Sequence, residues 1–154
     1  MKTAEILGEP PQDYDPIAAE AAYPYQELLG YEIAAWERDF CRVEMPLETR
    51  HQNRQGLPHG GVHATLLDTA MGFAGSWCPY PGRERKVMTL SLTVNYIGRP
   101  TGTRLIAEGR VTGGGRKSYF AEARLTDDLG NLIATATASM RYRGNSGAIE
   151  GDPA

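Results

Sequence analysis

The fold is decided by residues 59–77, which read HGGVHATLLDTAMGFAGSW. Apolar residues recur there every three or four positions, at Val62, Leu66, Ala70, Phe73 and Trp77. This spacing is that of one helix face, so we predict a helix over residues 60–76, about 25 Å long at 1.5 Å per residue. Further apolar positions widen the stripe, so we expect this helix to be buried on more than one side: Leu67, Met71 and Ala74.

Beyond this stretch the apolar period changes to two, which is typical of strands. Four such runs follow from Lys86 onward with short turns between them, so we predict an antiparallel meander. Their expected inward residues are Met88, Leu90, Leu92, Val94 and Tyr96; Leu105, Ala107, Gly109 and Val111; Tyr119, Ala121, Ala123 and Leu125; Leu132, Ala134, Ala136, Ala138, Met140 and Tyr142. Residues 31–46 predict one or two further strands. Because many inward residues are small, the helix can lie directly across the sheet, and the expected fold class is α+β.

The composition fits one domain. The chain has 154 residues, 41% hydrophobic and 23% charged, with a net charge of −3, which excludes a disordered chain. No apolar run approaches the ~18 residues that a membrane helix needs, and the N-terminus carries no apolar secretory segment. Cys41 and Cys78 are too few for a disulfide framework. We therefore expect a cytoplasmic protein with reduced thiols and no membrane partner.

The charge is unevenly distributed along the chain. Residues 1–68 carry 5 Lys or Arg against 12 Asp or Glu, whereas residues 69–143 carry 11 against 5. The basic residues are scattered over several predicted strands, which favours an anionic small molecule over nucleic acid, although they could equally be a solvated sheet face.

A second stripe of the helix is small except for one acid: Gly61, Thr65, Asp68, Gly72 and Gly75. Each interior Gly costs about 1 kcal/mol relative to Ala, and Asp68 has no basic residue four positions away. The pattern indicates that a substrate, another backbone or a second subunit comes close to the acid. Plain helix packing with a solvated Asp would leave the same pattern.

The helix begins at His59-Gly60-Gly61. Unpaired N–H groups and the positive end of the helix dipole can there polarise a carbonyl or hold an anion, although an ordinary turn would use the same residues. His59 and His63 have a metal-ligand spacing, but the third ligand would have to be His51 or Asp68, and Asp68 does not share a face with His63. No Gly-x-Ser-x-Gly elbow is present. We expect no metal and no other cofactor.

Four segments resemble, in order and spacing, the hotdog-fold acyl-CoA thioesterases of the PaaI-like (phenylacetyl-CoA thioesterase) branch: Asn53, His59-Gly60-Gly61, Leu67-Asp68-Thr69-Ala70 and the strand over residues 87–96. The resemblance covers residues 24–143 and leaves an N-terminal arm, 1–23, and a flexible C-terminal tail, 144–154. It implies a long central helix wrapped by an antiparallel sheet. It also implies a homodimer or a dimer of dimers, paired through an edge strand, with the site between subunits.

The resemblance implies five catalytic roles. Asp68 would be the catalytic carboxylate, as nucleophile or as general base on water. The Gly60 backbone N–H would point at the thioester oxygen. Asn53 would hydrogen-bond near that carbonyl or the attacking water, and His59 would hold the loop. Thr89, from the partner subunit, would position water.

The strand pattern conflicts with the last role. The alternation places Thr89 on the polar face, away from Met88 and Leu90. Thr89 can then serve the site only if that face meets the partner subunit.

Three residues are expected to bind substrate. Gly61 allows close approach at the helix start, and Arg116 and Lys117 follow three glycines in a connection between strands. Similar basic turns in relatives imply that these two cations hold the coenzyme A phosphates. The next candidates are Arg83, Arg85 and Lys86.

The expected function is hydrolysis of an acyl- or aryl-CoA thioester to the free acid and CoA. A thioester is an activated acyl group with a good leaving group, so one carboxylate and one N–H donor suffice. The alternative is a hotdog protein that binds acyl-CoA without hydrolysing it, but such proteins tend to lose the acid. A bare dimerisation module is a third possibility.

Overall fold

The long helix, α3, spans Gly60–Ser76 in the computed structural model, which describes residues 7–154. The predicted helix is thus confirmed. His59 caps its start, where its side chain accepts a hydrogen bond from the Gly61 N–H, and Trp77 follows its end. The helix is buried on more than one side, through Val62, His63, Leu66, Leu67, Ala70, Met71, Ala74 and Gly75.

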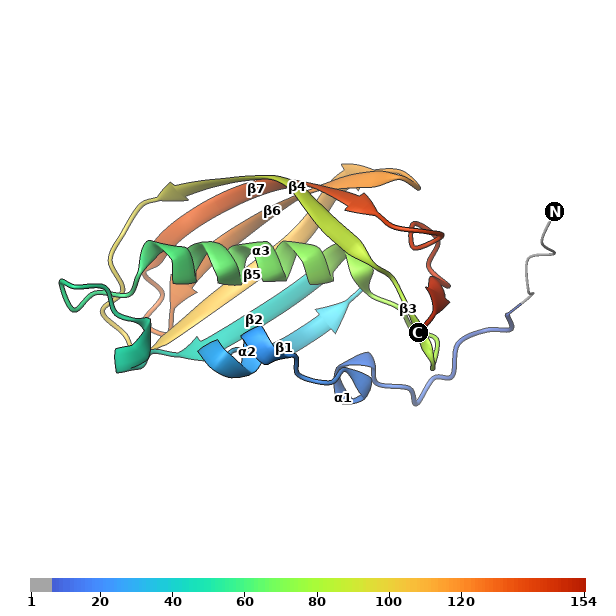
Figure 1. Ribbon diagram of the computed structural model, residues 1–154, viewed down its shortest axis with the longest axis horizontal. Coiled ribbons are helices and arrows are strands. Elements are labelled where there is room, and N and C mark those ends of the chain that lie inside the picture. Colours follow the sequence, from blue (N-terminus) through green and yellow to red (C-terminus); the bar gives the residue numbers. More distant parts are fainter. Residues whose placement is uncertain (1–6) are drawn as a thin grey trace.

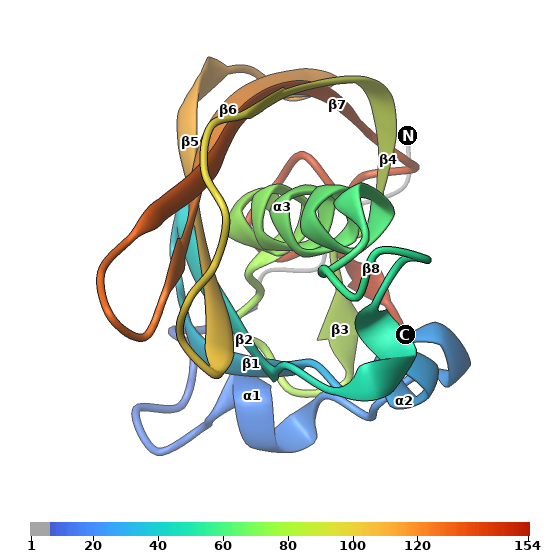
Figure 2. The ribbon, with the colours of Figure 1, turned by 90° about the vertical axis from the view of Figure 1, so that its left-hand side faces the viewer.

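Six antiparallel strands wrap this helix: β1 (Glu32–Glu37), β2 (Phe40–Pro46), β4 (Val87–Tyr96), β5 (Arg104–Gly114), β6 (Ser118–Asp127) and β7 (Leu132–Tyr142). Figure 1 shows α3 lying across the sheet, and Figure 2 looks roughly along the helix, with β5, β6, β7 and β4 arching around it. The expected α+β class, a long helix wrapped by an antiparallel sheet, is confirmed.

The strand order is β1-β2-β5-β6-β7-β4. We expected the last four strands to form a meander in chain order, and this was wrong for β4. Both edges of β5 are taken, one by β2 and one by β6, so β4 cannot lie beside the strand that follows it. It pairs with β7 instead and forms one edge of the sheet.

Small residues let the helix backbone touch the sheet. A side chain at Gly109 of β5 would place its Cβ 2.5 Å from the Ala70 carbonyl of α3. Around this contact the inward positions of β5, β6 and β7 are buried alanines: Ala107, Ala121, Ala123, Ala136 and Ala138. The close approach of helix and sheet was predicted from these residues.

A β-bulge lies in β4, where the pairing with β7 shifts between Thr89 and Ser91. One extra residue reverses which side chains face inward, because side chains alternate along a strand. Met88 and Leu90, which we expected inside, are therefore 47% and 56% exposed. Thr89 faces the helix instead.

Short elements complete the chain. The arm expected over residues 1–23 contains α1 (Pro16–Ala19), while its first six residues lie outside the described part of the chain. A second short helix, α2 (Pro24–Leu29), ends at Gly30, whose φ is 83°. A 3₁₀ turn, Thr49–His51, precedes α3. Within residues 7–154 no helix is long and apolar enough to cross a membrane, and both cysteines are buried and free.

We expected residues 144–154 to be a flexible tail, but in the structure they are bound to the segment around β3 (Arg83–Glu84). The strand β8 (Asp152–Pro153) pairs with β3. Arg83 donates to the Glu150 and Gly151 carbonyls. Hydrogen bonds hold the tail in place, and an apolar pattern in the sequence could not have revealed them.

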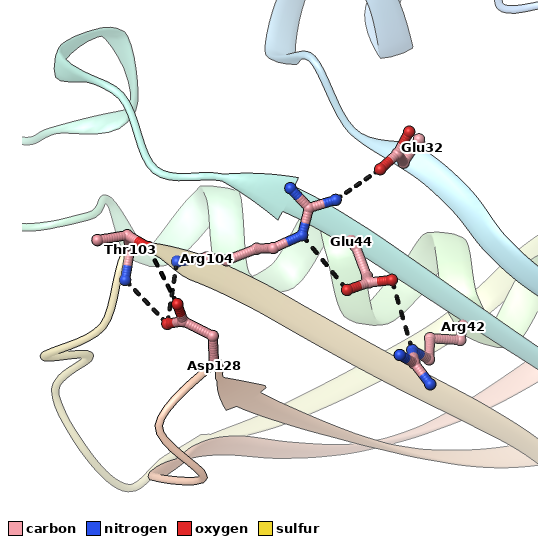
Figure 3. A network of polar contacts seen from close by, with 6 residues as sticks. All are labelled: Glu32, Arg42, Glu44, Thr103, Arg104 and Asp128. Atoms are coloured by element: carbon pink, nitrogen blue, oxygen red, sulfur yellow. Dashed lines mark hydrogen bonds and ion pairs between the residues drawn. The ribbon is translucent and has the colours of Figure 1, made fainter.

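A polar network joins β1, β2, β5 and the β6–β7 turn on the outside of the sheet (Figure 3). The Arg104 guanidinium donates to Glu32 and Glu44, and Glu44 also pairs with Arg42. Asp128 accepts from the Thr103 and Arg104 N–H groups. None of these residues lines the cavity described next, so the network belongs to the scaffold.

Candidate active site

Asp68 lies midway along α3 and is half-buried. Its Oδ1 accepts a hydrogen bond of 2.7 Å from the Thr89 hydroxyl of the same chain. The β-bulge after Thr89 produces this contact, because it turns that side chain toward the helix. The structure thus brings together two predicted site residues, but within one chain rather than across two subunits. Oδ2 of Asp68 is left as the oxygen that can act on a substrate.

A cavity of about 460 Å³ opens beside Asp68 and Thr89. One apolar wall comes from Trp36 of β1 and Phe73 of α3, whose rings meet edge to face with centroids 5.1 Å apart. The Trp36 indole N–H also donates to the main-chain carbonyl of Phe73 at 2.7 Å, which orients the indole ring. A volume of this size is typical of a small-molecule site.

Two further groups of residues close the cavity. The N-terminal arm contributes Tyr14, Pro16, Glu20 and Tyr23. Four cations also line the cavity: Arg83, Arg85, Lys86 and Arg143. The sequence reasoning missed the arm because nothing local in it signals that it lines a cavity.

The two glycines at the helix start differ in what their N–H groups do. The Gly61 N–H donates to His59 Nδ1 at 2.8 Å, so it is occupied. Gly60 is the first helical residue, and its N–H has no acceptor within the helix. The Tyr96 hydroxyl donates to the Gly60 carbonyl at 2.7 Å, and its ring lies against the glycine. Gly60 is therefore the better placed donor, and Tyr96 is a supporting residue that the sequence did not reveal.

The loop before the helix is held by its own polar groups. The Asn53 side-chain carbonyl accepts from the Gln55 and Leu57 N–H groups at 2.9 and 3.2 Å, so this oxygen serves the loop. His51 is 1% exposed, and its Nδ1 accepts from the Glu48 N–H while Nε2 donates to the Leu29 carbonyl. The His51 carbonyl in turn accepts from the His59 N–H at 2.8 Å. His51 is a second loop anchor that we had considered only as a metal ligand.

Gly60 and Asp68 are too far apart to serve one thioester in a single chain. They are eight residues apart on one helix, which corresponds to about 12 Å along its axis. A carbonyl bound about 3 Å from one group therefore cannot reach the other. If both act, they must come from different copies of the chain.

His63 is buried, with 5% exposure, and neither ring nitrogen has a hydrogen-bond partner among the described residues. Burial, with a smaller effect from His59, lowers the pKa of His63 below its usual value. Residues 7–154 contain no group of three His, Cys, Asp or Glu side chains arranged to hold a metal ion.

Arg116 and Lys117 are exposed in the β5–β6 turn and do not line the cavity. Main-chain hydrogen bonds nevertheless connect this turn to the cavity rim: Tyr142 N–H donates to Lys117, and Arg143 N–H donates to Lys86. Lys117, Arg143 and Lys86 thus lie at the ends of three neighbouring strands. Arg85 is already used, because it donates to the Ser146, Trp77 and Gly147 carbonyls and to the Tyr142 hydroxyl.

Comparison with known proteins gives one family. The family model described as Thioesterase superfamily matches residues 55–134, just over half of the chain. The medium/long-chain acyl-CoA thioesterase YigI of Escherichia coli is 26% identical over 129 residues, which cover 75% of this chain and 83% of YigI.

Two further similarities are more limited. A Haemophilus influenzae protein is 33% identical over 84 residues, covering 54% of this chain and 55% of that protein. The solved structure of the E. coli PaaI protein, from the phenylacetic acid degradation operon, superposes with a TM-score of 0.68 at 20% identity. That superposition covers 79% of this chain and 85% of PaaI and shows a shared hotdog fold.

Proposed function

This chain belongs to the thioesterase superfamily, and we propose that it hydrolyses an acyl- or aryl-CoA thioester to the free acid and CoA with Asp68 as its catalytic carboxylate. The observation that carries the proposal is the half-buried Asp68, which faces a substrate-sized cavity with one oxygen held by Thr89. A carboxylate fixed at one oxygen presents the other in a defined direction, which favours attack or proton abstraction.

The reaction needs few groups. Oδ2 of Asp68 either attacks the thioester carbon, forming an anhydride that water then hydrolyses, or takes a proton from an attacking water. In both routes the carbonyl oxygen gains negative charge, and the Gly60 N–H at the helix start stabilises it. The C–S bond breaks and CoA leaves as a thiolate. His59 holds Gly61 and so sets the direction of the Gly60 N–H.

The working unit is a homodimer or a dimer of dimers. The ~12 Å between Asp68 and Gly60 along one helix supports a site that pairs Asp68 of one protomer with Gly60 of its partner. β4 supports the same arrangement, because it is a long edge strand whose outward residues include the exposed Met88 and Leu90. Unpaired edges of this kind recruit another strand.

The coenzyme A phosphates lie on the basic surface that runs from Arg116 and Lys117 through Arg143 to Lys86. Backbone pairing of the strands that carry these residues supports one continuous surface reaching the cavity rim. The Arg143 side chain has no hydrogen bond or ion pair with the described residues, whereas Lys86 pairs with Glu84 at 3.0 Å. Arg143 is thus the cation of this rim that is most available to an anion.

The test is release of free thiol from a panel of acyl- and aryl-CoA thioesters by the purified protein, with the Asp68→Asn variant beside it. We expect turnover of at least one thioester by the wild type and none above background by the variant. Binding of acyl-CoA without turnover would instead identify a non-catalytic acyl-CoA-binding protein. Neither binding nor turnover would leave only a dimerisation module.

A further inference from the structure

The N-terminal arm lies outside the segment that matches the family, yet it forms part of the cavity beside Asp68. Four of its residues line that cavity: Tyr14, Pro16, Glu20 and Tyr23. In Figure 1 the arm runs below β1 toward the end of the molecule where α3 ends. The arm therefore adds a wall that the wrapped helix alone does not have.

The wall has a capped helix within it and one hydrogen-bonded anchor to the core. Asp15 caps α1 by accepting a hydrogen bond of 3.0 Å from the Ile17 N–H, and Pro16 occupies the first helical position. At the other end of the arm, the Tyr23 hydroxyl hydrogen-bonds the hydroxyl of Tyr31, which is 4% exposed. A segment anchored in this way can define the size of a pocket.

The charge of the arm decides which part of the substrate it meets. Within the described part of the arm the charged residues are all acidic, and Glu20 faces the cavity close enough to Glu84 that burial and this neighbour raise its pKa. An acidic arm offers no partner to phosphates. Five other residues of the cavity lining are apolar or aromatic, namely Tyr14, Pro16, Tyr23, Trp36 and Phe73. The arm and these side chains thus suit the acyl group, whereas Lys86 and Arg143 suit the nucleotide.

We propose that the N-terminal arm, through Tyr14 and Pro16, closes the acyl end of the cavity and sets the longest acyl group that the protein hydrolyses. This inference rests on the proposed function. An acyl chain that extends through this cavity of about 460 Å³ toward Tyr14 and Pro16 meets the arm, so the cut-off in chain length depends on these two residues.

The experiment compares kcat/KM of wild type, Tyr14→Ala and Tyr14→Trp over saturated straight-chain substrates from butyryl-CoA to palmitoyl-CoA. Tyr25→Ala is the matched control, because Tyr25 is a 50% exposed tyrosine on the neighbouring α2 and does not line the cavity. The readout is the ratio of kcat/KM for the first chain beyond the wild-type optimum to that for butyryl-CoA. Thermal unfolding shows whether each variant is folded.

We expect Tyr14→Ala to raise this ratio about fourfold, the factor that corresponds to burial of one further methylene group. Tyr14→Trp should lower it, and Tyr25→Ala should leave it unchanged. An equal fall at all chain lengths, or an unchanged ratio in both Tyr14 variants, would overturn the role of the arm. Failure of the wild type to hydrolyse any substrate would instead overturn the proposed function.

Discussion

In the proposed mechanism, Asp68 acts as an ionised carboxylate with one free oxygen. Asp68→Asn keeps the size and the acceptor for Thr89 but removes the basic, nucleophilic oxygen. We expect the variant to stay folded and to lose thioester hydrolysis by at least about 10², the usual contribution of a general base or nucleophile. Thr89→Ser, which keeps the hydroxyl, is the mild control. If the variant loses no more than about threefold of the wild-type activity, a loss far smaller than about 10², Asp68 is not part of the mechanism.

Two glycines of the same helix stripe behave differently in the structure. A Cβ at Gly72 would find Val87 no nearer than 3.9 Å, whereas a Cβ at Gly75 would lie 2.1 Å from the Tyr119 ring. We expect Gly72→Ala to raise stability by about 1 kcal/mol, because Ala favours helix interiors. Gly75→Ala should destabilise by about 1–3 kcal/mol through overpacking. Urea unfolding of both variants measures the difference, and equal shifts would contradict these packing environments.

These glycines also show where sequence reasoning stops. Their spacing placed both on one small stripe with Asp68, and that was enough to single out the stripe. The spacing could not show that Gly75 packs against the Tyr119 ring whereas Gly72 has room for a Cβ next to Val87. These two neighbours are far from the helix in the sequence.

His63 makes a prediction about pH. Its pKa is lowered in the folded state, so the unfolded chain binds a proton more readily than the folded one. Above the ordinary pKa of about 6.5 the side chain is neutral in both states and costs no stability. As the pH drops from there toward the lower pKa of the folded state, the free energy of unfolding falls. We expect His63→Leu to lose less stability than wild type between about pH 7.5 and about pH 5 in urea titrations. Parallel losses in the two proteins would contradict this.

At the scale of elements, β4 departs most from the prediction. One bulged residue between Thr89 and Ser91 reverses the faces of the residues before it, while Leu92 and Val94 after it pack against the core as expected. No residue type in the run marks the bulge. The pattern alone placed Thr89 away from the site, whereas the resemblance placed it in the site. The edge position of β4 could not be predicted either, because it depends on β2 having already taken one side of β5.

The cations of the β5–β6 turn and of the ends of β7 and β4 are predicted to bind the coenzyme A phosphates. Arg116→Ala/Lys117→Ala should raise KM several-fold and leave kcat nearly intact, as expected for uniform binding. The effect should shrink in high salt, since the Debye length falls from about 10 Å at 0.1 M to about 3 Å at 1 M. It should vanish with an acyl-pantetheine substrate that lacks the nucleotide.

Steady-state kinetics of Lys86→Ala/Arg143→Ala provide the comparison. A KM effect in this pair alone would place the phosphates at the cavity rim and not at the turn. Equal KM values for the wild type and both double variants at low salt would refute the whole basic surface.

At the scale of the molecule, the helix bounds, the inward faces of β5, β6 and β7 and the α+β class all followed from periodicity. The docked C-terminal tail and the arm beside the cavity did not, because main-chain carbonyls and single aromatic contacts hold them rather than an apolar pattern. The separation of Gly60 from Asp68 does follow from periodicity, because both residues belong to the predicted helix and lie about 12 Å apart along its axis. If both groups act as proposed, the assembly, rather than the single chain, is the unit of catalysis.

Mixed dimers test this claim most directly. Gly60→Pro removes the N–H at a helical position where proline is well tolerated, and Asp68→Asn removes the carboxylate, so each homodimer should be inactive. Random pairing of the two co-expressed variants makes half of the dimers mixed, and each mixed dimer holds one site with both groups intact, so we expect about a quarter of the wild-type activity. Activity no higher than the mean of the two inactive homodimers would contradict a site built from Asp68 of one protomer and Gly60 of its partner.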